Sequence, residues 1–129
     1  MLRLLLLPRL WRWMLVLEVA VVLYLALSPR PPQALDLGWD KLNHLAAFAC
    51  MAVTAARGFP NRWWGIMGGL LLLGALIEVL QSLTPHRYAE WADLLSDGLG
   101  TVLGLALGLL LQRWLPPFES RPTSGGVRA

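Results

Sequence analysis

Polar side chains beside the apolar stretches are the residues of this chain best suited to chemistry. Carboxylates and histidine can exchange protons and accept hydrogen bonds, while lysine and arginine can stabilise negative charge. Placing such groups in or beside an apolar helix is costly, so their positions are informative. The candidate ligand-binding or polar-network residues are Asp40, Lys41, His44, Glu78, Gln81, Arg87, Asp93 and Asp97.

The spacing of these candidates places them on common helical faces. Lys41, His44 and Phe48 are separated by three and four residues, and Asp93 and Asp97 by four. Residues with these separations lie one above another on a helix. Because every candidate falls at the same end of alternating spans, we expect helices two, three and four to surround one polar pocket.

Glu78 and His44 are the catalytic candidates, each as a general base. Glu78 falls within an apolar stretch, where its charge must be paired, neutralised or hydrated. His44 serves equally well as a satisfied buried side chain. Arg87 could bind a carboxylate or phosphate, or instead hold Asp93 in a structural ion pair.

Several function classes lack their usual sequence signals. No GxSxG, P-loop or dinucleotide motif is present, and no dense metal motif such as HExxH or CxxC. We therefore expect no cofactor and no metal. The net charge is +3, but the eleven Lys and Arg residues are scattered at helix ends rather than clustered, so we expect no nucleic-acid partner.

The composition indicates the elements that must position these residues. Hydrophobic residues make up 57% of the 129 positions and charged residues 15%, which is typical of a membrane protein. The length accommodates four spans of about 20 residues and no separate soluble domain. The expected fold class is all-α, a multi-pass transmembrane bundle of four helices.

Proline and glycine clusters divide the chain into four expected helices, at residues 10–27, 42–56, 63–83 and 92–115. The second is short and rich in alanine, so we expect it to pack inside the bundle. Glu18 in the first is expected to pair locally or extend to the membrane surface. The expected organisation is a cytoplasmic N-terminus at 1–9, a first transmembrane helix at 10–28, a three-helix core at 39–115 and a disordered cytoplasmic tail at 116–129.

Small residues predict how the helices pack. Gly100, Gly104 and Gly108 recur at every fourth position of the last helix, which permits close approach of another helix. Ala52 and Ala55 are the expected partners from the second helix. The polar cluster should thus lie above a tight small-residue seam.

The basic residues predict the orientation of the bundle. Eight fall on one side of four alternating spans: Arg3, Arg9, Arg12, Arg57, Arg62, Arg113, Arg121 and Arg128. Three fall on the other: Arg30, Lys41 and Arg87. Positive charge is retained on the cytoplasmic side, so both termini are expected there and the polar cluster is expected to face outward.

The polar and glycine patterns together resemble the VanZ-like family of small bacterial membrane proteins. The pattern is Asp40-Lys41-x-x-His44-x-x-x-Phe48, then Glu78-x-x-Gln81, then Arg87-(x)5-Asp93-(x)3-Asp97-x-x-Gly100-x-x-x-Gly104. It covers about 65 residues within the three-helix core at 39–115 and leaves out the first helix and the tail. Asp97 departs from the family, which often has Asn at this position, and so adds an acid to the pocket.

The resemblance implies a protein of the bacterial cytoplasmic membrane that reduces sensitivity to the glycopeptide antibiotic teicoplanin. The expected partner of the polar pocket is a membrane lipid, a cell-wall precursor or an amphiphilic antibiotic. The alternative is an intramembrane enzyme acting on an envelope lipid by general acid/base chemistry. Binding is favoured because no nucleophile signature is present; the sequence does not indicate an oligomeric state.

Overall fold

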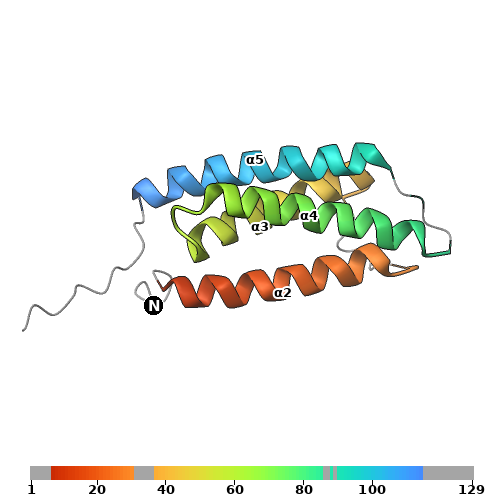
Figure 1. Cartoon of the computed structure of the whole chain (residues 1–129), viewed down its shortest axis with the longest axis horizontal. Helices are drawn as coiled ribbons and strands as arrows, with labels where there is room; N and C mark the ends of the chain where they lie inside the picture. Colours follow the sequence, from red (N-terminus) through yellow and green to blue (C-terminus); the bar gives the residue numbers. More distant parts are fainter. Residues whose placement is uncertain (1–6, 31–36, 86–87, 89, 115–129) are drawn as a thin grey trace, which may run out of the picture.

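The computed structural model describes residues 7–30, 37–85, 88 and 90–114. They form four helices, α2 (Pro8–Leu27), α3 (Asp40–Gly58), α4 (Trp63–Ser82) and α5 (Trp91–Trp114), without a strand in these ranges. Figure 1 shows the helices side by side, alternating in direction along one long axis. The all-α four-helix prediction is confirmed, and every described helix end lies within two residues of its predicted position.

The helix ends follow from local chain chemistry. Pro8 occupies the first turn of α2, where its missing N–H is not needed. After Gly58 the chain turns through Pro60 and Asn61, whose φ of 64° lies in the left-handed region that asparagine tolerates. At the end of α4, Pro85 follows Thr84 and does not continue the helix.

Helix α3 is the most enclosed element of the bundle. It has its most extensive contact with α5 and also packs against α2, whereas α2 contributes no buried residue. Phe48, Met51 and Ala52 of α3 are at most 1% exposed. The prediction that the second helix packs inside the bundle is therefore confirmed.

The contact between α3 and α5 depends on the three predicted glycines. A Cβ at Gly100 would collide with the carbonyl oxygen of Leu45, and one at Gly104 with that of Ala49. A Cβ at Gly108 would lie 2.7 Å from the Cβ of Ala56. The α3 backbone itself excludes a side chain at Gly100 and Gly104, and the Ala56 methyl group crowds one at Gly108. We call this line of contact the glycine seam.

The predicted α3 side of the seam is only partly right. Ala52 faces Gly104, with 2.7 Å between its Cβ and the position of an added Cβ. Ala55 instead lines a groove on the other side of α3, toward α2 and α4. Positions 49, 52 and 56 follow the three- and four-residue helical repeat, so Ala55 falls one position off this face.

Glu18 joins α2 to α3. The hydroxyl of Thr54 donates a hydrogen bond of 2.9 Å to Oε1 of Glu18, 36 positions earlier in the chain. The expectation of a local partner or an extended side chain was wrong, because the hydroxyl of Thr54 on the neighbouring helix is the donor to this carboxylate. The pair links the middle of α2 to α3.

Three of the helices, α2, α4 and α5, are long and apolar enough to cross a membrane. Exposed aromatic side chains occur near both ends of the bundle: Trp13, Trp64 and Trp114 at one end, and Trp39, Tyr88 and Trp91 at the other. Such amphipathic rings favour the two membrane–water interfaces. The exposed surface between them is rich in leucine, as expected for a surface that faces lipid.

Candidate functional site at the acidic end of the bundle

The candidate polar residues meet where α3 and α5 begin and α4 ends, at the right of Figure 1. We call this the acidic end, defined by the carboxylates Asp40, Glu78, Glu90, Asp93 and Asp97. Asp40 and Asp93 lie in the first turns of α3 and α5. Negative charge is favourable at those two positions because it opposes the positive end of each helix dipole.

Lys41 is the central cation among the described residues of this end. Its ammonium lies 2.8 Å from Oε2 of Glu90 and 3.6 Å from Oδ1 of Asp93. Through that hydrogen bond and its charge, Lys41 holds the pKa of the exposed Glu90 carboxyl below its usual value. Lys41 thus connects the start of α3 to the loop before α5 and to α5 itself.

His44 and Asp97 form the buried part of the site. Nδ1 of His44 lies 2.9 Å from Oδ1 of Asp97, whose side chain is 0% exposed. A carboxylate bonded to one ring nitrogen orients the imidazole and favours a proton on that nitrogen. The lone pair of the neutral ring is then on Nε2.

Gly74 of α4 makes room for the Asp97 carboxylate. A Cβ at Gly74 would lie 2.6 Å from Oδ2 of Asp97 and 3.2 Å from a methyl carbon of Leu94. Gly74 is not among the residues that the sequence pattern predicts for this site. It could have been found from its position four residues before Glu78, which places it on the same face of the helix.

Glu78 fastens the loop before α5 to α4. Its Oε2 accepts a hydrogen bond of 2.8 Å from the backbone N–H of Glu90. The residue is 8% exposed, and within the described part of the chain its Oε1 accepts no hydrogen bond. One oxygen of this carboxylate is therefore structural and the other is left for a further donor.

Two other buried carboxylate oxygens, like Oε1 of Glu78, lack a hydrogen-bond donor among the described residues. Oδ1 of Asp93 and Oδ2 of Asp97 also accept no hydrogen bond from any residue that the structure describes, although Lys41 lies near the former. Burying a carboxylate oxygen without a donor costs free energy. The acidic end thus holds three buried acceptor atoms, from α4 and α5, that a donor group would stabilise.

The remaining predicted site residues are Gln81, Asp40 and Arg87, of which the structure describes the first two. Gln81 is buried and donates a hydrogen bond of 3.1 Å to the carbonyl oxygen of Ala26, so it ties α4 to α2. Asp40 is exposed and follows the N-cap residue Trp39, which makes no side-chain cap bond. Arg87 lies outside the described residues.

A metal ion has one set of candidate ligands here. One ligand atom from each of Asp40, His44 and Asp93 lies within 4.8 Å of the others. This mixture of oxygen and nitrogen suits a divalent cation. Lys41 already places positive charge beside Asp93, so an ion would have to compete with this ammonium.

Fold and site together define a small helical membrane protein with a carboxylate-rich cluster at one end of its bundle. The chain belongs to the VanZ/LLP1 family, whose pattern it matches over residues 3–112. The match begins before α2 and so includes the first helix, which the polar and glycine pattern alone does not cover.

Curated proteins of other names also show local similarity. The protein nucleotidyltransferases YdiU of Salmonella paratyphi B and Salmonella newport are each 35% identical over 83 residues, 63% of this chain and 16% of theirs. The chloroplastic protein root UVB sensitive 2 of Arabidopsis thaliana is 31% identical over 101 residues, 73% of this chain and 23% of its own. The chain thus spans about a sixth of the YdiU proteins that it matches. No solved structure matches the chain.

Proposed function

We propose that the acidic end binds the headgroup of an envelope amphiphile that supplies N–H or O–H donors to its buried carboxylates. The observation that carries this proposal is the set of three buried oxygens without a hydrogen bond, on Glu78, Asp93 and Asp97. A ligand donor at Glu78 or Asp97 would recover free energy that the described residues leave unrecovered, at about 1.5–3 kcal/mol for a hydrogen bond to a charged group. At Asp93 it would add to the charge of Lys41, which lies 3.6 Å from Oδ1.

The position of the cluster favours an amphiphile over a freely soluble ligand. The carboxylates lie where apolar helices end, close to the exposed aromatic residues Trp39 and Trp91. A molecule whose tail lies in the membrane would present its headgroup at this depth. The apolar helix surfaces below would then contact the tail.

Three envelope molecules share the required donors: an envelope lipid with an ammonium group, a cell-wall precursor and a glycopeptide antibiotic. Membership of the VanZ/LLP1 family makes teicoplanin the first to be tested, with altered antibiotic sensitivity as the expected phenotype. The proposal includes a bacterial cytoplasmic membrane location, with both termini cytoplasmic and the acidic end outward, as the eight-to-three distribution of basic residues predicts.

The proposal is tested by binding to the purified full chain in detergent. Teicoplanin, phosphatidylethanolamine and a polyprenyl-linked cell-wall precursor are titrated separately, and dissociation constants are measured for the parent, Glu78→Gln and Glu18→Gln. Glu18 is the matched control because it is also a partly enclosed glutamate with one oxygen unbonded within the described ranges, on α2.

We expect one of the three ligands to bind the parent and Glu78→Gln to bind it at least about tenfold more weakly, which corresponds to about 1.4 kcal/mol. Glu18→Gln should bind like the parent. Failure of all three to bind, or equal binding by the parent and Glu78→Gln, would remove the acidic end from the function.

The hydrogen bond between His44 and Asp97 supports a second candidate, an intramembrane enzyme acting on an envelope lipid by general acid/base chemistry. A buried carboxylate that orients a histidine prepares the other ring nitrogen to take a proton. Lys41 would stabilise the negative charge that develops on the lipid.

Incubation of the purified chain with envelope lipid extract, followed by mass spectrometry, separates this candidate from binding alone. A product formed by the parent and lost in His44→Gln, with lipid binding unchanged, would establish turnover. An unchanged extract would leave binding as the function.

A further inference from the structure

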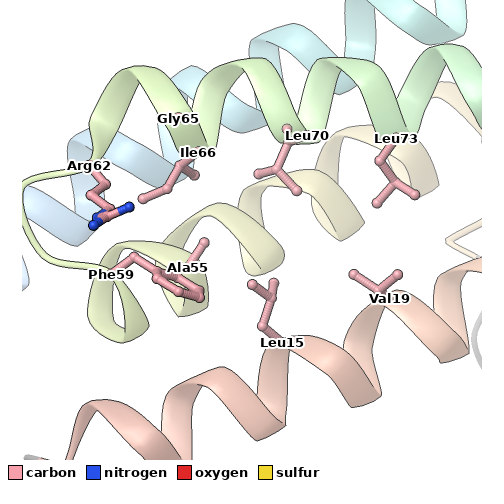
Figure 2. A pocket seen from close by; sticks show the side chains of 10 residues that line it. Leu15, Val19, Ala55, Phe59, Arg62, Gly65, Ile66, Leu70 and Leu73 are labelled. Carbon is pink, nitrogen blue, oxygen red and sulfur yellow. The ribbon is translucent and has the colours of Figure 1, made fainter.

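A second candidate site lies away from the acidic end, between α2, α3 and α4. It is a groove of about 480 Å³ whose walls are almost entirely apolar. Figure 2 shows side chains from three directions around it: Leu15 and Val19 from α2, Ala55 and Phe59 from α3 and its cap, and Ile66 and Leu70 from α4. This volume is within the usual range for sites that bind small molecules.

Glycine keeps this groove open. Gly65 and Gly69 of α4 line it, and a Cβ added to either would meet no atom within 4 Å. This is the opposite of the glycine seam, where an added Cβ would collide with atoms of α3. Space is therefore available beside α4 for an apolar group that the described residues do not supply.

Positive charge lies at one end of the groove. Arg62 belongs to its lining, and the guanidinium of Arg12 lies 4.8 Å from the ring centre of Phe59, another lining residue. Arg12 also donates a hydrogen bond of 2.8 Å to the carbonyl oxygen of Gly58. Arg62 precedes α4, so these cations lie at the end of the bundle opposite the carboxylates.

We infer that the groove binds an anionic phospholipid, with one acyl chain between α2 and α4 and its phosphate on the Arg62 guanidinium. An apolar wall next to a basic rim matches a molecule with an apolar chain and an anionic head. The planar guanidinium provides paired N–H donors suited to phosphate oxygens. Water is a poor occupant, because the apolar walls offer it few hydrogen-bond partners.

The site is independent of the proposed function. It uses none of the residues of the acidic end, and its ligand is anionic at the head, whereas the acidic end suits a donor-rich headgroup. Either site can fail its test without affecting the other.

The test is native mass spectrometry of the full chain in mild detergent, titrated with phosphatidylglycerol or with diacylglycerol of the same chains. Gly69→Leu fills the groove, while Gly68→Leu is the matched control. Gly68 is on the same helix, has nothing within 4 Å of an added Cβ and does not line the groove.

We expect the parent and Gly68→Leu to bind phosphatidylglycerol equally and Gly69→Leu to lose at least about tenfold in affinity. Circular dichroism checks that each variant is folded. If Gly69→Leu is not folded, Gly65→Leu blocks the same wall about one turn earlier. Unchanged binding in a folded blocking variant would overturn the proposal.

The headgroup contact is tested separately with Arg62→Gln, and Arg113→Gln serves as a basic-residue control on α5. The parent and Arg113→Gln should prefer phosphatidylglycerol over diacylglycerol by about tenfold or more, and Arg62→Gln should lose this preference. Equal binding of the two lipids by the parent would overturn the phosphate contact. A dimer that Gly69→Leu converts to monomer would show that a second copy of the chain fills the groove, and would also overturn the proposal.

Discussion

At the scale of single residues, the acidic end places its carboxylates in two different environments. Glu90 is exposed and shares its charge with Lys41, whereas Asp97 is enclosed and meets His44 on one side and the backbone of Gly74 on the other. Water and salt screen the first pair, so it contributes little to stability. The enclosed aspartate depends on the shape of its surroundings.

Gly74→Ala tests this dependence on shape. The added methyl would lie 2.6 Å from Oδ2 of Asp97, and overpacking of this kind costs about 1–3 kcal/mol. We expect the unfolding temperature in detergent to fall. Gly68→Ala, whose Cβ meets nothing within 4 Å, should leave it unchanged or raise it slightly, because alanine favours helix.

The double variant Gly74→Ala/Asp97→Ala identifies the atom responsible. Removing the carboxylate should make the Gly74→Ala substitution much less destabilising than it is in the parent. If Gly74→Ala costs the same with and without Asp97, the tight contact between α4 and this carboxylate is incorrect.

The pair of Lys41 and Glu90 predicts a dependence on pH. The pKa of Glu90 is lowered in the folded state, so its ionised form contributes stability above the unfolded value of about 4.3. That contribution is lost as pH falls through the lower folded pKa. Glu90→Gln should therefore destabilise the protein slightly at pH 7 and less at pH 3.

Chemical unfolding of the parent and Glu90→Gln in detergent at the two pH values measures this effect. Lys41→Met supplies the control, since Glu90→Gln should have no effect in its presence at either pH. A penalty for Glu90→Gln that is the same at pH 3 and pH 7 would exclude the charge as its cause.

At the scale of helices, glycine has two opposite uses in this bundle. On α5 it lets the backbone of α3 approach closely, and on α4 it leaves a groove open. The regular spacing of Gly100, Gly104 and Gly108 made the first use predictable. The open groove on α4 could not be predicted, because the sequence does not indicate which face of α4 lies toward the loosely packed α2.

Gly104→Leu is the strongest test of the glycine seam. Its Cβ would collide with the carbonyl oxygen of Ala49 and lie 2.7 Å from the Cβ of Ala52, so α3 and α5 would have to separate. We expect loss of folded protein, or a stability decrease of at least about 3 kcal/mol. Ala106→Leu adds comparable bulk to an exposed position of the same helix and should be tolerated.

Size-exclusion chromatography and thermal unfolding in detergent compare the two leucine variants. If Gly104→Leu accumulates and unfolds like Ala106→Leu, then Gly104 does not face α3.

At the scale of the whole molecule, much of the architecture could be predicted because proline and glycine clusters mark the helix ends. The contacts of Glu18 and Gln81 could not, since each binds a partner on another helix, Thr54 in one case and Ala26 in the other. Such pairs depend on the rotation of each helix about its axis. Helical spacing predicts which residues share a face of a helix, but not which other helix packs against that face.

The two ends of the bundle differ in charge, and this difference predicts how the bundle is oriented in the membrane. Arg12, Arg57 and Arg62 lie at one end and the acidic cluster at the other, with eight of the eleven basic residues assigned to the first side. Because cytoplasmic loops retain Lys and Arg, we expect the acidic end to face away from the cytoplasm. Tyr88 at that end is 85% exposed, which makes it a suitable position for a labelled cysteine.

Labelling of intact bacterial cells with an impermeant thiol reagent tests the orientation, in a Cys50→Ser background that removes the native thiol. Tyr88→Cys should react in intact cells, whereas Ser124→Cys should react only after the membrane is permeabilised. The permeabilised sample is the control for reagent access. The reverse pattern would place the carboxylates in the cytoplasm, where an extracellular antibiotic or an outer-leaflet headgroup could not reach them, and the proposed ligand would have to be sought among cytoplasmic amphiphiles instead.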